Sequence, residues 1–176
     1  EKLIAYEAGY RFTRNALSID LAAFVNDYSD LITQEFSGPA TLGFVNRLKG
    51  QSVGLELAID WQASDTWDWQ LAYAYHHFAL EPAAPLINTS GILAGEGSTP
   101  KQQLSIRTGI DLSEDIEFDI WARMVGKVKA ANAATLTSIP SYVALDARLG
   151  WQISDNLELS IVGQNLLDAS HPEFVH

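Results

Sequence analysis

Large apolar side chains alternate with small or polar ones along most of this sequence. Between Val53 and Trp61 every odd position carries a large apolar residue, whereas the even positions carry Gly, Glu, Ala and Asp. An α-helix repeats every ~3.6 residues and would spread this set around its circumference, but a strand places alternate residues on opposite faces. The same alternation recurs, strongly or weakly, over residues 3–12, 17–28, 67–76, 104–112, 116–127, 143–152 and 157–163. The pattern therefore predicts an all-β chain of about eight strands.

The segments between these strands have two lengths, short and long, which alternate along the chain. Short polar turns are expected at residues 13–15, 64–66, 113–115 and 154–156. Longer connections that contain Gly, Pro or Ser are expected at roughly 29–46, 80–99 and 128–140. Outer-membrane barrels have short turns at the periplasmic end and long loops at the extracellular end. The alternation of lengths therefore predicts an antiparallel up-and-down meander of long strands that forms part of a transmembrane β-barrel.

The two faces of the predicted sheet differ in chemistry. One face is apolar and nearly uncharged along the middle of each strand, whereas the other carries charges of both signs together with Gly and Ala. The charged positions on that second face are Glu7, Arg11, Asp20, Glu56, Asp60, Arg107, Asp111, Asp119, Arg123, Asp146 and Arg148. A soluble β-sandwich would alternate in the same way, so the difference between the faces does not by itself identify a membrane protein.

Strand length and aromatic placement favour the membrane. Several strands are expected to run for about 10–14 residues, which is longer than the usual strand of a soluble sheet. Phe12, Trp61, Trp67, Trp69 and Trp151 stand close to the short turns. Aromatic side chains gather at the two membrane–water interfaces of such barrels, so these five residues are interpreted as part of an interfacial girdle.

Composition excludes several classes of function. The chain has 176 residues, a net charge of -11 and a pI near 4.6, which argues against a nucleic-acid partner because phosphate binding requires a basic face. No apolar run reaches about 18 residues, so no transmembrane helix is predicted. The sequence contains no cysteine and no arrangement typical of a nucleophile, a phosphate loop or a metal centre. We therefore expect neither an enzyme nor a bound metal or cofactor.

Two constellations that could suggest chemistry have a structural interpretation. His76 and His77 are adjacent on a predicted strand, so their side chains point to opposite faces and cannot share one metal ion. Glu56 and Asp60 lie about 13 Å apart along one strand, too far for the carboxylate pair of a glycosidase.

Several segments resemble TonB-dependent receptors of the bacterial outer membrane. The most specific is the Gln-Asn-Leu-Leu-Asp stretch at 164–168, followed by His-Pro-Glu-Phe at 171–174. That stretch belongs to a final segment, residues 139–151 and 157–168, which closely resembles the end of these receptors. Upstream, residues 22–32, 46–56 and 99–103 match barrel strands of the same family. The resemblance covers essentially the whole chain and implies one incomplete domain, residues 1–176, in the C-terminal portion of the barrel. Neither a plug domain nor a closing strand with a terminal aromatic is recognised, which implies about eight late strands of a barrel of about 22.

The resemblance implies transport rather than catalysis. Such a wall would contact outer-membrane lipid, house a plug and present loops to a scarce nutrient such as a ferric siderophore, haem or cobalamin. Energy would come from the TonB complex, recruited through an N-terminal part of the receptor. Two alternatives stay open: the eight strands could close into a small outer-membrane barrel, or they could form a soluble β-sandwich that binds a ligand.

Ligand contacts are expected in the loops and the upper lumen, where the resemblance places them. On residue chemistry, the candidates are the aromatic Phe36 and Phe44 and the cationic Arg47, Lys127 and Lys129. Cations and aromatic rings suit an anionic metal chelate.

Overall fold

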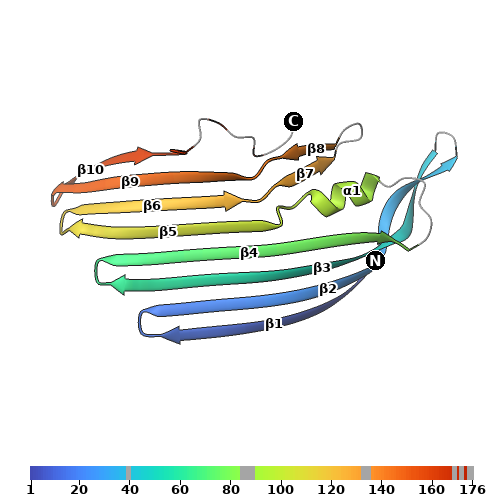
Figure 1. The fold of residues 1–176 in the computed structure, drawn as a ribbon, viewed down its shortest axis with the longest axis horizontal. Helices are drawn as coiled ribbons and strands as arrows, with labels where there is room; N and C mark the ends of the chain where they lie inside the picture. Colours follow the sequence, from blue (N-terminus) through green and yellow to red (C-terminus); the bar gives the residue numbers. More distant parts are fainter. Residues whose placement is uncertain (39–40, 84–89, 132–135, 168–169, 171–172, 174–176) are drawn as a thin grey trace.

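The computed structural model describes residues 1–38, 41–83, 90–131, 136–167, 170 and 173. Eight strands form one antiparallel sheet in the order β1-β2-β3-β4-β5-β6-β9-β10, and they lie side by side along the length of the molecule (Figure 1). The strands are β1 (Lys2–Arg14), β2 (Leu17–Gly38), β3 (Thr41–Ser64), β4 (Trp67–Pro82), β5 (Gln102–Ser113), β6 (Ile116–Val125), β9 (Tyr142–Ser154) and β10 (Leu157–Gly163). The predicted all-β antiparallel meander is confirmed.

The four predicted short turns are present and lie together at one end of the sheet, which we call the turn end (Figure 1). Their turn residues are 15–16, 65–66, 114–115 and 155–156. Asn15 has a φ of 49°, in the left-handed region that Asn tolerates better than most side chains. Local sequence chemistry therefore determines this end of the fold.

The opposite end carries helix α1 (Ser90–Gly97) and a hairpin of β7 (Val128–Ala131) with β8 (Leu136–Ile139), and we call it the helix end. No helix in the described part of the chain is long and apolar enough to span a membrane. The helix and the hairpin occupy the predicted connections at 80–99 and 128–140, together with the last residues of β4.

The predicted loop at 29–46 is wrong, because most of it is strand. β2 and β3 contain 22 and 24 residues and stay paired out to Gly38 and Thr41. Their hairpin projects beyond the neighbouring strands at the helix end (Figure 1). The pairing shifts between Tyr28 and Leu31, where Asp30 has a φ of 57°. This irregularity shifts the alternation of side chains, so the pattern could not be followed through it.

The register places the large apolar residues of successive strands in continuous rows on one face. The central row consists of Tyr10, Leu21, Leu57, Tyr73, Leu104, Met124 and Val143. One residue further along, the opposite face carries the row Arg11, Asp20, Ala58, Ala72, Ser105, Arg123 and Ala144. We call these the apolar face and the polar face.

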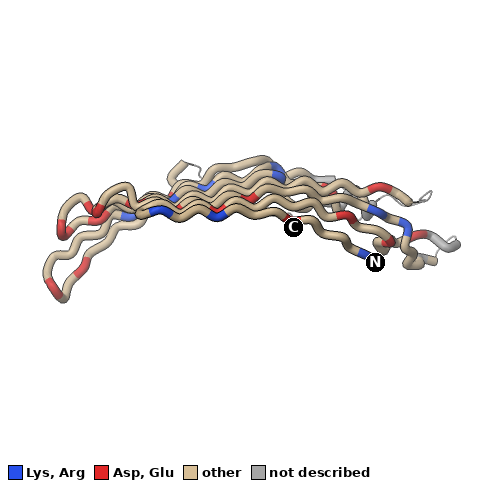
Figure 2. Tube along the Cα trace, turned by 90° about the horizontal axis from the view of Figure 1, so that it is seen from below, with Lys and Arg blue, Asp and Glu red and all other residues tan. Residues whose placement is uncertain are grey.

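The sheet is a single open layer without a packed core. Among the described residues only Leu48, Ile139 and Ala144 are buried apolar side chains, whereas Tyr10 on the apolar face is 62% exposed. Seen edge-on, the strands form one thin curved layer with acidic residues near the tips at the turn end (Figure 2). A β-sandwich would bury this face against a second sheet, and a closed barrel would pair β1 with β10, which instead are the two edges. The described residues therefore match neither alternative architecture.

The aromatic residues beside the turns lie on the apolar face, as the alternation predicts. Trp61 stands opposite Trp69, and the rings of Trp67 and Trp69 are 5.3 Å apart. The indole N–H of Trp67 donates to the hydroxyl of Thr108 at 2.7 Å. Trp67 thus has an aromatic neighbour for its ring and a polar partner for its indole N–H, which suits a membrane interface.

Candidate functional site

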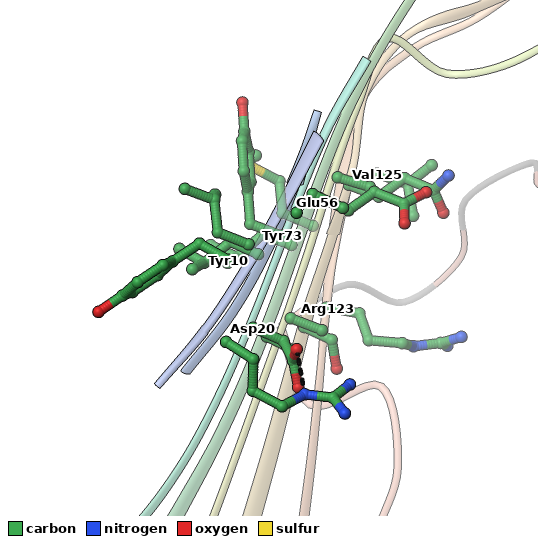
Figure 3. Close-up of a pocket in the computed structure, with 18 of the residues that line it drawn as sticks. Tyr10, Asp20, Glu56, Tyr73, Arg123 and Val125 are labelled. Atoms are coloured by element: carbon green, nitrogen blue, oxygen red, sulfur yellow. Dashed lines mark hydrogen bonds and ion pairs between the residues drawn. The ribbon is translucent and has the colours of Figure 1, made fainter. Parts of the chain in front are cut away.

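A trough on the polar face encloses about 890 Å³. Its floor is made of small side chains, including Ala58, Ala72 and Ala74. Figure 3 shows Asp20, Glu56 and Arg123 on this side of the sheet, while Tyr10 and Tyr73 point to the other side. Because strand residues alternate between faces, rows of alanine beneath charged residues leave a shallow channel with charged walls.

The arginines that line the trough have two kinds of partner, a carboxylate and an aromatic ring. The guanidinium of Arg11 donates to the carboxylate of Asp20 at 2.7 Å across neighbouring strands. The guanidinium of Arg123 lies 5.6 Å from the ring centre of Trp121, whose indole N–H donates to Ser105 at 2.9 Å. Exposed pairs of this kind add little to stability, so they mainly hold charge in place along the trough.

An aromatic cluster lies on the same face, nearer the helix end. The rings of Phe24 and His76 are 6.2 Å apart, those of His76 and Phe78 are 6.4 Å apart, and Tyr28 meets Phe78 edge-on at 5.7 Å. Beneath them, Gly54 has no side chain that could displace Phe24. The sequence indicates part of this cluster, because Phe24 lies four residues after Asp20 on the same strand. Residues separated by an even number of positions share a face, so Phe24 belongs to the polar face.

At the turn end, Arg148 is surrounded by carboxylates of the polar face. Its guanidinium contacts Glu117 at 3.0 Å and Asp119 at 3.1 Å, and it also bonds the carboxylate of Glu158. In the described part of the chain, no group of three or more His, Asp or Glu has an arrangement that could hold a metal ion. The cluster therefore joins three neighbouring strands, β6, β9 and β10, through a single cation.

Replacing Arg148 by Gln should lower the thermal unfolding midpoint of the folded barrel, because three carboxylates would then face one another without a cation. The loss should shrink in high salt, which screens charges at this exposure. Arg123→Gln is a matched control, because that guanidinium belongs to none of the ion pairs found between described residues. Differential scanning calorimetry in detergent measures both. Equal midpoints for the two variants would show that the cluster contributes nothing.

A second hollow of about 620 Å³ opens at the helix end, beyond the point where β4 and β5 stop pairing. Strand β4 continues to Pro82, but its pairing with β5 stops at Tyr75 and Gln102. Helix α1 fills part of the vacated edge, and the carboxylate of Glu96 accepts the backbone N–H of Leu80 at 2.8 Å. The hollow lies between the end of β4, the end of α1, the start of β5 and the link from β6 to β7.

Lys101, Lys127 and Lys129 line this hollow together with His77, and we call these four residues the lysine notch. Two of the predicted ligand contacts, Lys127 and Lys129, are thus brought together by the structure. Lys101 was missed, because in the sequence it only marks the start of a strand. Lys101 lies in the notch because β5 begins opposite Tyr75, whereas β4 continues to Pro82.

The other three predicted contacts lie in the extended β2–β3 hairpin and outside the notch. Phe44 is 73% exposed and stands opposite Gln34 in the pairing of the two strands. Arg47 is exposed, and its carbonyl accepts the N–H of Ala83 at 2.8 Å. The backbone of Phe36 pairs with Leu42, and its side chain lies outside the described part of the structure. These residues belong to strands, not to the loop that was expected.

The two adjacent histidines lie on opposite faces, as predicted. His76 packs in the aromatic cluster of the polar face, whereas His77 lines the notch and its Nδ1 is buried without a hydrogen-bond partner. The two imidazoles therefore lie in separate environments.

Comparison with known proteins gives a consistent set of similarities. A family model described as "TonB dependent receptor-like, beta-barrel" matches residues 1–166. The pesticin receptor of Yersinia pestis is 25% identical over 181 residues, which cover 96% of this chain and 24% of that receptor. The chain thus spans about a quarter of the length of the curated relatives it matches.

Solved structures share the arrangement of strands. The ferric-catecholate import receptor Fiu of Escherichia coli K12 superposes with a TM-score of 0.77 and 19% identity, over 96% of this chain and 24% of that one. The siderophore receptor PiuA of Acinetobacter baumannii gives a TM-score of 0.75 and 22% identity, over 93% of this chain and 24% of that one. At these identities the likeness establishes the fold alone.

Proposed function

Because the chain belongs to the family of TonB-dependent receptor β-barrels, we propose that it is part of the wall of a receptor that takes up a scarce nutrient. Proteins of this family are receptors and transporters in the bacterial outer membrane. We place residues 1–176 in the C-terminal portion of the barrel, as one incomplete domain. The observation that carries the proposal is the single open layer, with a continuous apolar face on one side and a charged trough on the other.

The two faces have different partners in this proposal. The apolar rows contact outer-membrane lipid, because large exposed aliphatic and aromatic side chains on a one-layer sheet require an apolar surround. The polar face lines the lumen and packs against a plug supplied by another part of the receptor. Energy reaches the receptor through the TonB complex, which binds outside this segment. The wall itself catalyses no reaction and holds no cofactor.

The substrate class is a metal chelate, with ferric siderophores favoured over haem and cobalamin. Two of the similar structures carry siderophore or ferric-catecholate receptors in their names. We assign Phe36, Phe44, Arg47, Lys127 and Lys129 as ligand contacts, since all five belong to segments at the helix end. This end is the extracellular one, because the short turns of such barrels face the periplasm.

Deleting the gene that encodes the full receptor should abolish growth on at least one ferric siderophore as the sole iron source. Radiolabelled iron uptake measures the effect, and a strain without TonB provides the control that must lose the same uptake. Expression of residues 1–176 alone should restore nothing, because it supplies neither a plug nor a complete wall. Unchanged uptake across a panel of catecholate, hydroxamate and carboxylate siderophores, haem and cobalamin would contradict the proposal.

A further inference from the structure

The β2–β3 hairpin loses both of its neighbouring strands at one level of the wall. On one side, the pairing of β1 with β2 stops at Lys2 and Ser29. On the other side, the pairing of β3 with β4 stops at Leu48 and Pro82. Beyond this level, in the described part of the chain, the two strands of the hairpin pair only with each other. We call this part of the hairpin the arm; it consists of residues 31–38 and 41–46.

The pairing inside the hairpin is irregular at the same level. The successive partners are Tyr28–Gly50, Leu31–Leu48 and Ile32–Asn46. Between the first two pairs β2 advances by three residues and β3 by two, whereas between the last two pairs β2 advances by one and β3 by two. The extra residue on β2 is thus balanced by an extra residue on β3. Bulges bend a strand pair and increase its twist, and Figure 1 shows the hairpin, in cyan, turning away from the direction of the other strands.

Side chains from three strands meet at this bend. Asp30 has a φ of 57°, in the left-handed region that Asp and Asn adopt more readily than other side chains. Its carbonyl oxygen accepts a hydrogen bond from the side-chain amide of Asn46 at 2.6 Å. Its carboxylate contacts the ammonium of Lys2 at 3.1 Å, and the carboxylate of Glu1 accepts the N–H of Ile32 at 3.1 Å. We call the bond between Asp30 and Asn46 the clamp, because it joins the bulge of β2 to the first residue of the arm on β3.

The direction of the arm decides what its two sides face. Thr33 and Glu35 are 6% and 4% exposed, whereas Ile32 and Phe44 are 51% and 73% exposed. Phe44 lies two residues from Asn46 on the same strand and therefore shares its side of the arm. From Ile32 to Gly38 the arm extends for about 20 Å, so a tilt of roughly 15° at the bend would move its end by about 5 Å.

We propose that Asp30 and Asn46 are positioning residues, which hold the arm at one angle and thereby place Phe36 and Phe44 for the ligand. A two-stranded hairpin is marginal by itself, and the neighbouring strands end where the arm begins, so contacts at the bend determine its direction. The ion pair with Lys2 is exposed and adds little, which leaves the clamp and the left-handed backbone of Asp30. The inference rests on the proposed function for the two aromatic contacts, whereas the geometry of the bend does not.

The first test measures the direction of the arm without a ligand. Spin labels are attached to cysteines introduced at the exposed residues Thr41, in the arm, and Lys101, beside the start of β5. Double electron–electron resonance on the full receptor in lipid vesicles measures the distance between them. Asn46→Asp should shift or broaden this distance by about 5 Å. The reason is that an ionised aspartate has no N–H to donate to the carbonyl of Asp30.

Two matched variants separate the clamp from a general loosening of the hairpin. Asn26→Asp makes the same exchange within the wall, where Asn26 donates to Ser52 at 3.1 Å and both neighbouring strands are paired. This variant should leave the distance unchanged. Asp30→Asn keeps a residue that tolerates the left-handed region and should also leave it unchanged, whereas Asp30→Val should shift it as Asn46→Asp does.

The second test asks whether the clamp acts through the aromatic residues. The probe is the ferric siderophore that the uptake panel identifies, titrated against the purified receptor. Asn46→Asp should weaken binding by about threefold or more, and it should add no loss in the F36A/F44A background, because residues that act through one another are not additive. A heated gel shows that each variant is a folded barrel.

An unchanged distance in Asn46→Asp would overturn the proposal, since the packing of Thr33 and Glu35 would then suffice to fix the arm. An equal shift in Asn26→Asp would overturn it as well, because the clamp would have no special role. A further loss of affinity in the F36A/F44A background would show that the clamp does not act through these rings. A receptor that binds no compound of the panel would contradict the proposed function, while the distances would still decide whether the clamp fixes the arm.

Discussion

Replacing Leu104 by Arg is expected to lower the free energy of unfolding of the barrel by about 2–4 kcal/mol, the cost of a cation at the lipid face near mid-membrane. Leu104 lies in the central apolar row, with Tyr73 on one side and Met124 on the other. An Arg there would place its guanidinium among apolar side chains and acyl chains, where neither water nor a carboxylate satisfies it. Denaturant unfolding of the full receptor in lipid vesicles measures the difference.

The adjacent residue provides the control. Gln103 is exposed on the polar face, in the row that holds Glu56 and Ala74. Gln103→Arg adds the same charge to the same strand and should change the unfolding free energy by less than about 1 kcal/mol, as a surface substitution does. If the two variants cost the same, the face assigned to lipid would be wrong.

Period two was sufficient to predict the faces and the turn end. A one-residue step along a strand moves a side chain to the other face, so residues such as Leu57 and Glu56 are assigned correctly as soon as the strand is recognised. The four short turns are local features, since each consists of a few polar residues between two alternating runs. Both properties are encoded within about ten residues, which is why no tertiary information was needed.

The helix end could not be predicted in the same way. The extended β2–β3 hairpin continues across an irregular pairing near Asp30, and a shift of register there exchanges the two faces in the sequence pattern. Helix α1 has eight residues without acidic groups in its first turn or basic groups in its last. Such a short helix is marginal by itself, and its contacts with β4, including the Glu96 bond to Leu80, hold it in place.

The notch depends on distances that the sequence does not state. Lys127 and Lys129 are neighbours in the chain, so their proximity is trivial, but Lys101 joins them only through the pairing of β5 with β6. The hollow exists because β4 extends beyond β5, and strand ends are the least certain part of any pattern. Residue chemistry selected Lys127 and Lys129 as candidates, and the topology places Lys101 beside the same hollow.

Gly54 provides a sharp test of the aromatic cluster on the polar face. A Cβ at this position would lie 2.2 Å from the ring of Phe24, so even alanine forces that ring out of its place beside His76. Gly54→Ala should therefore lower the free energy of unfolding by about 1–3 kcal/mol, as overpacking does. Gly9 lies on the same face, where a Cβ would have an ordinary contact of 3.7 Å with the carbonyl of Leu21. Gly9→Ala should be neutral or stabilising by up to about 1 kcal/mol, since it restricts the unfolded chain.

If displacement of the Phe24 ring causes the destabilisation by Gly54→Ala, the size of that destabilisation must depend on Phe24. In a Phe24→Leu background the ring is absent, and Gly54→Ala should cost at least about 1 kcal/mol less than in wild type, a coupling typical of residues in contact. Denaturant unfolding of the four proteins of this double-mutant cycle gives the coupling energy. Additive effects would mean that the penalty arises from the backbone of β3 and not from the ring. The glycine would then serve the pairing of strands, and the cluster of Phe24, Tyr28, His76 and Phe78 would assemble without needing the space that Gly54 leaves.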